Sequence, residues 1–496
     1  MTALLWTSIC DLAKMAVLSR LSNIETGALI VIDQTEGRKY VFGQPIEDGE
    51  EVDCHCHNNG RISCLEGHEP HIEVNDNGLT HDEDSSPAAS PNNNDSLPTA
   101  GADNAPKTTN LHKPPTTTLI IRSLTVYPLL LLQTDHGFAS SYLLSYLDVR
   151  PSLTAFFRLF ILNRDTLHNG TTLPSQVLNR LLGGVKQAWD VVTKLLGTQK
   201  GELARARRDV RRHYDLGNEL FAAFLSKDMT YSCPIWEANP PLGREETLEE
   251  AQDRKIKHII SLARLKPTDH VLEIGSGWGS FAITAAKTVG CRVTSLTLSR
   301  EQKAWTDQKI ADAELGHLVE VLLMDYRELE LPESEEERFD KVVSIEMIEA
   351  VGEKGLRGFF ERVDALVKRR GGIVVLQGIV MPEGRHEEYS KREDFINRYI
   401  FPGGYLPSTT QLINHITAAS TGTLIIERIE NIGGHYARTL RLWRERFLAN
   451  FDSKIKPALT RENPNWTEGD VEVFRRKWEY YFSYCEAGFM TKTLGT

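Results

Sequence analysis

The sequence has no long hydrophobic run, few cysteines and no excess of positive charge. The longest apolar candidate, residues 119–132, is interrupted by Arg122 and Pro128 and falls short of the roughly 18 consecutive apolar residues that a membrane-spanning helix needs. Seven cysteines at irregular spacing favour a reduced cytoplasmic chain over a disulfide framework. The first twenty residues contain Asp11 and lack a positive start, so no signal peptide is predicted.

The net charge of −11 in 496 residues is concentrated in one segment. Residues 46–118 hold 14 acidic and three basic residues, a difference equal to the net charge of the whole chain. The same segment is rich in Asn, Ser, Pro, Asp and Gly, a composition that buries too little apolar surface to offset the entropy of ordering. We predict a disordered acidic insertion over residues 46–117, and a remainder that is neutral overall.

The insertion divides a small N-terminal domain, predicted over residues 1–45 and 118–198. Alternating apolar residues at 27–34 and 39–42 flank Glu36-Gly37, which indicates a β-hairpin. The apolar run at 118–132 is typical of a strand, and helices are predicted over about 137–165 and 175–197. The catalytic domain is predicted to span residues 199–496.

Strands and helices alternate from about residue 245 onward. Strands are predicted at 270–275, 292–298, 319–324, 341–347 and 372–380, and helices at 280–289, 300–314 and 353–368. This alternation predicts a doubly wound, mostly parallel α/β sheet that binds ligands at the carboxyl ends of its strands.

A glycine-rich turn follows the first of these strands. The segment Val271–Gly279 reads VLEIGSGWG, in which Glu273 precedes a Gly-x-Gly-x-Gly turn that opens a helix. Glycines allow a tight turn and a close approach of backbone to ligand. The spacing differs from the Gly-x-Gly-x-x-Gly of dinucleotide sites. It resembles the first motif of Rossmann-like methyltransferases, which bind S-adenosylmethionine.

Six further segments sharpen this resemblance, which covers about residues 200–490. They are His213–Phe221, Thr230–Trp236, Thr297–Gln302, Ser344–Gly352, Tyr399–Ser408 and His435–Leu440. In this order they resemble the cyclopropane fatty acid synthase family. Residues 14–45 joined to 118–165 resemble, more loosely, the small N-terminal domain of full-length synthases. The resemblance implies a class I methyltransferase fold with a seven-stranded sheet and a small α+β N-terminal domain.

Members of that family add the methyl group of S-adenosylmethionine to a cis double bond in a phospholipid acyl chain. The resulting carbocation loses a proton and closes to a cyclopropane ring. The resemblance places Gly275 and Gly277 against the methionine part of the cofactor, and Thr297, Leu298 and Gln302 on the ribose and adenine side. The other implied cofactor residues are Tyr214, Tyr231, Ser232, Glu273, Trp278, Gly279, Asp325 and Tyr326. An aromatic face beside the sulfonium contributes about 0.5–2 kcal/mol.

The resemblance also implies a bound bicarbonate as the base, because a strong side-chain base near a sulfonium risks being methylated. It places this anion among Cys233, Glu349, the backbone of Ile379 and Tyr436. Glu349 is expected to stay ionised and to accept the bicarbonate hydroxyl, while the other groups donate hydrogen bonds.

The sequence departs from the best-known bacterial members at Gln377, where they have a histidine. A glutamine donates a hydrogen bond but does not titrate. We favour a site that is intact with a neutral donor. The alternative is a different handling of the proton, with a methyl-branched or methylene lipid as product.

Aromatic residues are needed to keep water from the cation. Phe395, Tyr399, Phe401 and Tyr405 are candidates for the wall of an acyl tunnel, with ordinary core packing an equal alternative. Cys485 matches a cysteine once proposed as catalytic in the family, but a bicarbonate mechanism leaves it no clear role, and we favour a structural one.

Two further patterns bear on partners. Residues 199–213 form a locally basic helix with six Lys and Arg residues, which suggests either peripheral contact with anionic lipid or a merely solvated face. No recognition motif indicates nucleic acid, and a homodimer is left open. The insertion contains Cys54, Cys56 and Cys64 with neighbouring histidines, but it lacks paired Cys-x2-Cys spacing, so no metal site is expected.

The leading interpretation is therefore a cytoplasmic, peripherally membrane-associated enzyme that cyclopropanates unsaturated phospholipids. Methylation of a sphingolipid base or of a small amine is a second enzymatic interpretation. A non-catalytic lipid-binding or cofactor-binding paralogue is a third, but it would be expected to have lost the glycine loop or Glu349.

Overall fold

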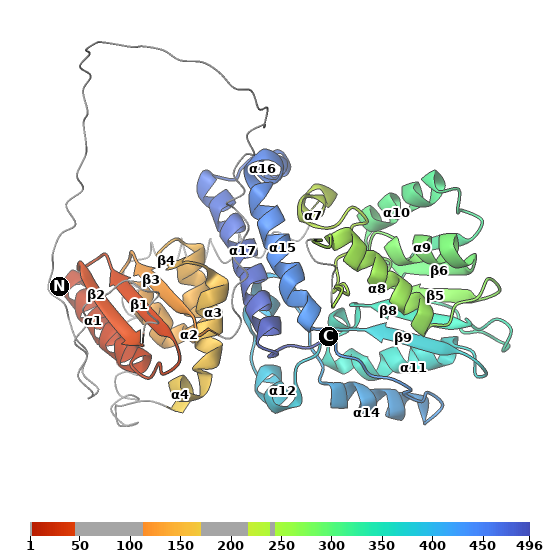
Figure 1. Ribbon diagram of the computed structural model, residues 1–496, viewed down its shortest axis with the longest axis horizontal. Coiled ribbons are helices and arrows are strands. Elements are labelled where there is room, and N and C mark those ends of the chain that lie inside the picture. The colour runs from red at the N-terminus through yellow and green to blue at the C-terminus, as the bar shows by residue number, and fades with distance from the viewer. Residues whose placement is uncertain (1, 45–112, 170–216, 239–243) are drawn as a thin grey trace, which may run out of the picture.

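The computed structural model describes residues 2–44, 113–169, 217–238 and 244–496. In these residues the chain builds two separate sheets with a pair of long helices between them (Figure 1). The predicted insertion, the basic segment 199–213, the helix at 175–197 and Tyr214 lie largely or wholly outside the described residues.

The N-terminal sheet has four strands in the order β2-β1-β3-β4. Strands β1 (Ala28–Asp33) and β2 (Arg38–Gly43) form the predicted antiparallel hairpin. Strand β3 (Thr116–Ile121) pairs with β1 in parallel, and β4 (Leu147–Arg150) pairs with β3 antiparallel. The β1–β3 pairing brings together the two segments that flank the insertion in the sequence.

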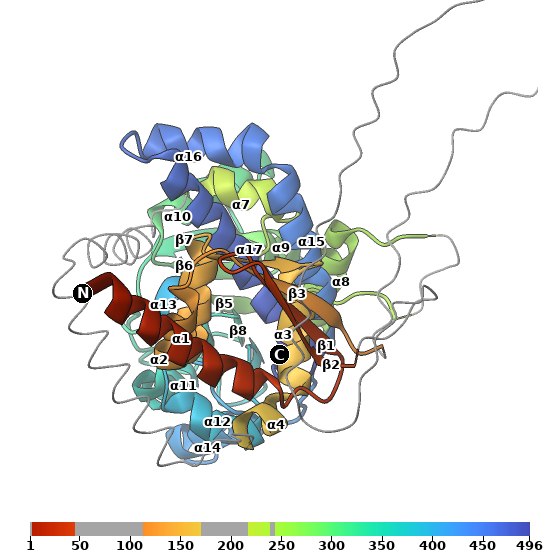
Figure 2. The ribbon, with the colours of Figure 1, turned by 90° about the vertical axis from the view of Figure 1, so that its left-hand side faces the viewer.

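Helices complete this unit. They are α1 (Thr2–Leu21), α2 (Val126–Leu143), α3 (Leu153–Leu162) and α4 (Arg164–Asn169). The helix α1 packs against α2, and α3 packs against β3 and β4 (Figure 2). The strand predicted over 118–132 is right only as far as Ile121. The following apolar residues belong to α2, whose buried side chains pack in the core. An apolar run alone does not distinguish a buried strand from a buried helix.

The second sheet has five parallel strands in the order β7-β6-β5-β8-β9. They are β5 (His270–Ile274), β6 (Arg292–Thr297), β7 (Val319–Leu323), β8 (Lys341–Ile345) and β9 (Ile373–Gln377). All five predicted strands are present, and the doubly wound architecture is confirmed.

Helices cover both faces of this sheet. One apolar core lies between the sheet and α8 (Leu248–Leu262), α9 (Ser280–Val289) and α10 (Arg300–Asp312). A second lies between the opposite face and α11 (Leu356–Leu366) and α14 (Thr409–Ser420). The parallel strands are therefore covered on both sides, as their continuous apolar runs require.

The predicted count of seven strands is wrong for the described residues. After α14, residues 424–430 run without strand pairing, and Ile425 and Ile429 are 83% and 59% exposed. Beyond β9, a single antiparallel bridge joins Val380 to Gly495. One bridge does not form the ladder of hydrogen bonds that defines a further strand.

The helices α15 (Gly434–Ala449) and α17 (Glu468–Met490) lie between the two sheets (Figure 1). They pack against each other, and α17 also packs against α2 and α3 of the N-terminal unit. On the other side, α15 contacts α7 (Asn218–Phe224). Short segments complete this region, namely α12 (Glu383–Ser390), α13 (Phe395–Tyr399), a π-helical turn at Phe451–Ile455 and α16 (Lys456–Glu462).

Buried ionic contacts join α17 to the N-terminal unit. The Arg476 guanidinium donates to the carbonyls of Tyr142 and Leu147, at 2.6 and 2.8 Å, and to Asp148 at 2.7 Å. Arg444 of α15 donates to the Glu486 carboxylate at 2.6 Å, and the Thr154 hydroxyl of α3 donates to the same oxygen at 2.8 Å. The two units are therefore fixed to each other by polar contacts as well as by apolar packing.

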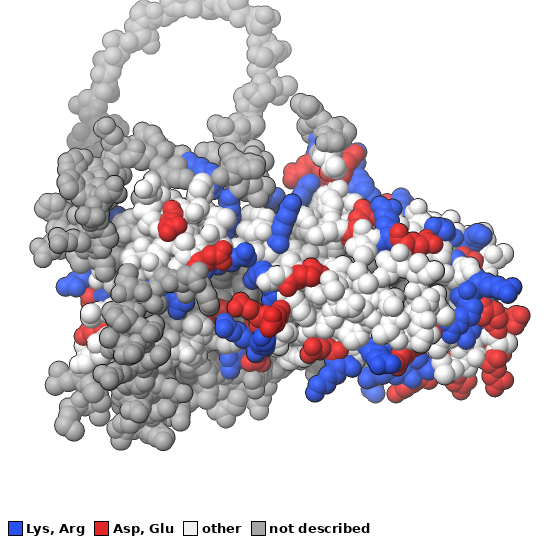
Figure 3. Space-filling view, turned by 90° about the horizontal axis from the view of Figure 1, so that it is seen from below, with Lys and Arg blue, Asp and Glu red and all other residues white. Residues whose placement is uncertain are grey.

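On the face of the molecule that Figure 3 shows, side chains of both signs are interspersed. In the part of the chain that is described, no helix combines the length and apolarity needed to cross a membrane.

Replacing Arg444 by methionine should destabilise the protein. Glu486 is 3% exposed, and it would lose its charged partner, which typically costs about 3 kcal/mol. The matched control is Arg461→Met, which removes an exposed pair with Glu219 and should change stability little. Thermal unfolding measures both. Equal shifts for the two variants would contradict the structural role of the Arg444–Glu486 pair.

Candidate active site

The glycine loop follows β5 and opens α9, as the sequence predicts. Gly275 has a φ of +98°, and a Cβ there would lie 3.1 Å from the Cβ of Met347. Gly279 has a φ of +85°, and a Cβ there would lie 2.3 Å from the Cγ2 of Thr306 on α10. The positive φ therefore favours glycine at both positions, and at Gly279 the close contact with Thr306 excludes a side chain as well. The loop is held in contact with the end of β8 through Met347.

A cavity of about 780 Å³ opens beside this loop. Its wall includes residues from the carboxyl ends of β5, β6 and β8, where a doubly wound sheet binds ligands. The segment before α8 and the residue Phe401 complete the wall.

Most of the predicted cofactor residues line this cavity. They are Tyr231, Ser232, Glu273, Gly275, Gly277, Trp278, Leu298 and Gln302. The Trp278 indole donates to the side-chain oxygen of Asn218 at 2.9 Å, and the hydroxyls of Tyr231 and Tyr481 lie 2.8 Å apart. These contacts orient two aromatic rings at the cavity wall.

Four predicted cofactor residues do not line the cavity. Gly279 allows α9 to approach α10, and the buried Thr297 hydroxyl donates to the Gln302 side-chain oxygen at 2.9 Å. Asp325 accepts hydrogen bonds from Arg327, and the ring of Tyr326 packs edge-on against Phe359. Thr297 therefore positions a residue of the wall, while Asp325 and Tyr326 have structural contacts.

Two buried ionisable groups face the cavity. Lys255 is 1% exposed and donates to the Ser232 hydroxyl at 2.9 Å, and burial lowers the pKa of its ammonium group. Burial raises the pKa of Glu273 to about 8, although a hydrogen bond from the Ser295 hydroxyl opposes the shift. The sequence marked Glu273 but offered no reason to single out Lys255, which lies in an ordinary amphipathic helix.

Glu346 is a second residue of the cavity wall that the sequence did not single out. It follows β8, lines the cavity and has a φ of +50°. Its carboxylate accepts three hydrogen bonds, from the Cys233 backbone at 2.9 Å, from the Gln377 amide at 2.8 Å and from the Tyr436 hydroxyl at 2.5 Å. Its position in the segment Ser344–Gly352 was visible in the sequence, but the family resemblance directed attention to Glu349, three residues later.

Glu349 lies beside Glu346 but has fewer partners. One of its oxygens accepts a hydrogen bond from the Ile379 backbone at 2.5 Å, and the other is buried without a partner. Burial and the negative charge of Glu346 raise the pKa of Glu349 to about 8. Burial also raises the pKa of Glu346, but its three donors oppose that shift. Of this coupled pair, Glu346 therefore holds the negative charge near neutral pH, which differs from the expectation that Glu349 stays ionised.

The other predicted catalytic groups are already engaged. The Cys233 thiol is fully buried and faces the carbonyls of Pro234 and Ile432, and burial raises its pKa. The Gln377 amide nitrogen also donates to the Cys233 carbonyl at 3.1 Å. The pKa of Tyr436 is raised by burial and by Glu346, so its hydroxyl keeps its proton and donates.

Cys485 lies on α17 among aromatic residues of the core and does not line the cavity. Burial raises the pKa of its thiol, so the nucleophilic thiolate form is disfavoured. This environment fits the structural role that the sequence favoured.

Of the predicted tunnel aromatics, Phe401 lines the cavity and is 41% exposed. Phe395 packs on Tyr480 with ring centroids 4.1 Å apart, and Tyr399 contacts the Ser140 hydroxyl at 3.5 Å. The Tyr405 hydroxyl lies 2.9 Å from His386. Phe395 and Tyr399 are buried, as the alternative of core packing has it, whereas Tyr405 is half-buried and contacts Tyr389 and His386 of α12.

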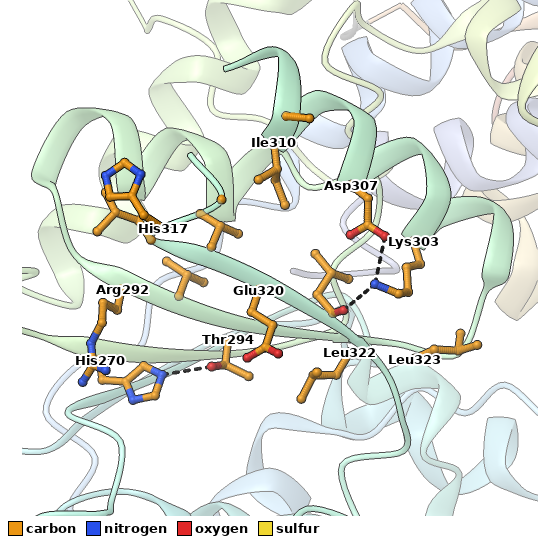
Figure 4. A pocket seen from close by; sticks show the side chains of 16 residues that line it. His270, Arg292, Thr294, Lys303, Asp307, Ile310, His317, Glu320, Leu322 and Leu323 are labelled. Atoms are coloured by element: carbon orange, nitrogen blue, oxygen red, sulfur yellow. Dashed lines mark hydrogen bonds and ion pairs between the residues drawn. The ribbon is translucent and has the colours of Figure 1, made fainter. Parts of the chain in front are cut away.

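A second cavity of about 760 Å³ lies beside the edge strand β7 and α10 (Figure 4). Lys303 is paired there with Asp307 at 2.8 Å and with the Val321 carbonyl at 2.7 Å, and His270 lies 2.9 Å from the Thr294 hydroxyl. The glycine loop and the glutamate pair are not part of this cavity. Within the described residues, no group of three or more His, Cys, Asp or Glu side chains is arranged to hold a metal ion.

Comparisons with known proteins agree with this geometry. Residues 202–495 match the family described as mycolic acid cyclopropane synthetase. The tuberculostearic acid methyltransferase UfaA1 of Mycobacterium tuberculosis is 43% identical, over 58% of this chain and 62% of that protein. The cyclopropane-fatty-acyl-phospholipid synthase of Escherichia coli is 34% identical, over 57% of this chain and 65% of that protein. The chain thus matches less than two thirds of the length of either relative.

A solved coclaurine N-methyltransferase, bound to N-methylheliamine and S-adenosylhomocysteine, covers 72% of this chain and 94% of its own, with a TM-score of 0.50 and 19% identity. At 19% identity this similarity is evidence for the fold alone. That fold is the methyltransferase fold that the sequence predicts.

Replacing Glu349 by glutamine should change how stability depends on pH. A carboxyl whose pKa is raised on folding contributes stability below its ordinary pKa and loses that contribution as pH rises through the folded value, here from about 4.5 to about 8. The substituted glutamine has no such loss, since it does not ionise. The melting temperature of Glu349→Gln relative to the unsubstituted protein should therefore rise with pH by the equivalent of a few kcal/mol.

Thermal scans across this pH range measure the difference, and Glu361→Gln, at an exposed position of α11, is the control. A difference that does not vary with pH would show that Glu349 is not protonated in the folded protein.

Proposed function

Because the chain belongs to the mycolic acid cyclopropane synthetase family, we propose that it transfers the methyl group of S-adenosylmethionine to a cis double bond in an unsaturated phospholipid acyl chain. Closure to a cyclopropane ring completes the proposed reaction. One observation carries the proposal: a single cavity is lined both by the glycine loop and by the half-buried Glu346. The methyl donor and the group that handles the proton can therefore face one substrate carbon.

The cofactor part of the proposal rests on the cavity wall. Gly277 has a φ of +51° and open space beside it, so a ligand can approach its backbone closely. Tyr231 and Trp278 present aromatic faces to a sulfonium. Gln302, held by Thr297, supplies a polar group at the carboxyl end of β6. These residues bind and orient the cofactor, whose sulfonium supplies the electrophilic methyl group.

The lipid part rests on the relatives, one of which is named for fatty-acyl phospholipids and another for a fatty acid. Apolar side chains at the cavity support it, because Phe401, Phe221 and Ile345 offer no nucleophile to a carbocation. Peripheral membrane contact, a cytoplasmic location and a homodimer stay predictions, as do the domain boundaries. The basic segment 199–213 lies outside the described residues.

A methyl-branched or methylene lipid is the second candidate product. This product stays a competitor because Gln377, the residue that departs from the bacterial pattern, donates to Glu346 at 2.8 Å and so alters the site that would handle the proton. Bicarbonate itself stays a prediction. A sphingolipid or a small amine as substrate would appear in the same experiment as a different methylated product.

The product should be identified by expressing the chain in a bacterium that makes no cyclopropane lipids. We expect phospholipid acyl chains that gain one CH2 unit and carry a cyclopropane ring, detected by mass spectrometry and proton NMR. Gly275→Val is the inactive control, because its side chain meets Met347. A gain of CH2 with a retained olefin indicates the methylene product, and unchanged phospholipids would reject the proposed substrate.

Cofactor binding can be tested separately with S-adenosylhomocysteine. Gly279→Ala should weaken binding and lower the melting temperature, because alanine at a φ of +85° is strained and also meets Thr306. Gly290→Ala is matched, with a φ of +83° and open space around it, so it should show the conformational cost of about 1–2 kcal/mol alone. Calorimetry and thermal scans compare the two variants. Equal binding by both would contradict a role for the α9–α10 contact in shaping the cofactor loop.

A further inference from the structure

We propose that the Glu346 carboxylate is the proton acceptor of this enzyme and occupies the place that a bound bicarbonate would take. The inference rests on the proposed function, which requires removal of a proton from a carbocation. It assigns the base to a side chain of the protein itself.

The arrangement of donors carries the proposal. An anion-binding site built for bicarbonate would point its donors at a space that the anion fills. Here the Cys233 backbone, the Gln377 amide and the Tyr436 hydroxyl converge instead on the two oxygens of Glu346, at 2.9, 2.8 and 2.5 Å. The family resemblance places these same residues, Cys233, Gln377 and Tyr436, around the bicarbonate. The anion that they hold in the structure is Glu346.

The backbone places this carboxylate at the reaction cavity. Glu346 has a φ of +50°, which a residue with a side chain adopts at a cost and which is common at functional sites. The next residue, Met347, lies against Gly275 of the glycine loop, and both line the same cavity as Glu346. The carboxylate thus lies on the wall that also holds the proposed methyl-donor loop.

The proposed proton transfer balances. The methyl carbon leaves the sulfonium with breakage of its C–S bond and forms a C–C bond to one alkene carbon, which leaves a positive charge on the other carbon. A Glu346 oxygen then accepts a proton from the transferred methyl group. The electron pair of that C–H bond closes the third C–C bond of the ring. S-adenosylhomocysteine, the cyclopropane and a protonated Glu346 result, and Glu346 returns its proton to water.

The surroundings explain how a carboxylate tolerates a neighbouring sulfonium. Three hydrogen bonds engage the lone pairs of Glu346 and lower its nucleophilicity toward the methyl group. Glu349 stays protonated beside it, so the pair holds one negative charge. Lys255, buried on the same cavity wall, adds a positive charge that favours the ionised form of Glu346.

The test uses Glu346→Gly and Glu346→Gln in the full chain. Glycine removes the carboxylate, accepts the positive φ and leaves an opening among the three donors, whereas glutamine fills the same space without a basic oxygen. Both should lower turnover by about 10²- to 10⁴-fold. Added bicarbonate or formate should recover at least tenfold activity in Glu346→Gly and none in Glu346→Gln. The unsubstituted enzyme should be insensitive to bicarbonate depletion, and a loss of its activity on depletion would overturn the proposal.

A second measurement does not depend on turnover. Isotopically labelled bicarbonate should show NMR line broadening with Glu346→Gly saturated with S-adenosylhomocysteine, and none with the unsubstituted chain. Broadening with the unsubstituted chain, suppressed by Tyr436→Phe, would assign the site to bicarbonate and refute the inference. If no lipid is modified, the proposed function is wrong. The NMR measurement still shows whether bicarbonate binds among the three donors of the unsubstituted chain.

Discussion

The half-buried carboxylate of Glu346 organises the centre of this protein. Glu346 accepts hydrogen bonds from residues 233, 377 and 436, which come from the segment before α8, from the end of β9 and from the start of α15. A charge that is partly removed from water is costly without partners, and these three segments supply the partners of Glu346. These hydrogen bonds therefore fix the segment before α8, strand β9 and helix α15 relative to one another.

The helices α15 and α17 connect the surroundings of Glu346 to the N-terminal unit. Tyr436, which donates to Glu346, stacks on Phe489 of α17 with ring centroids 4.6 Å apart. The same helix α17 reaches the N-terminal unit through Arg476 and, with Arg444 of α15, through Glu486. The four-stranded sheet is therefore not a separate module. It packs on the helix pair that also carries Tyr436, a hydrogen-bond donor to Glu346.

Much of the catalytic unit follows from local patterns. Continuous apolar runs placed the five parallel strands, and the helix at 280–289 begins and ends at the predicted residues, because a glycine loop precedes it and Gly290 ends it. The helical part of residues 118–132 was not distinguishable from a strand, since an apolar run is compatible with both. The count of seven strands failed because strand pairing depends on partners that are distant in the chain, and residues 424–430 find none in the described structure.

The sequence by itself determined the α/β class and the position of the glycine loop, because strand–turn–helix patterns are local and a glycine turn is visible in the sequence. It also predicted several of the residues that line the cavity beside this loop. Only the tertiary structure decided how the two glutamates divide their roles. Glu346 and Glu349 lie three residues apart in one motif, and nothing in the sequence distinguishes their environments. Three donors from distant segments converge on the first, while one donor and a buried, unpaired oxygen mark the second. The energy of a buried charge depends on such donors, and their convergence exists only in the folded chain.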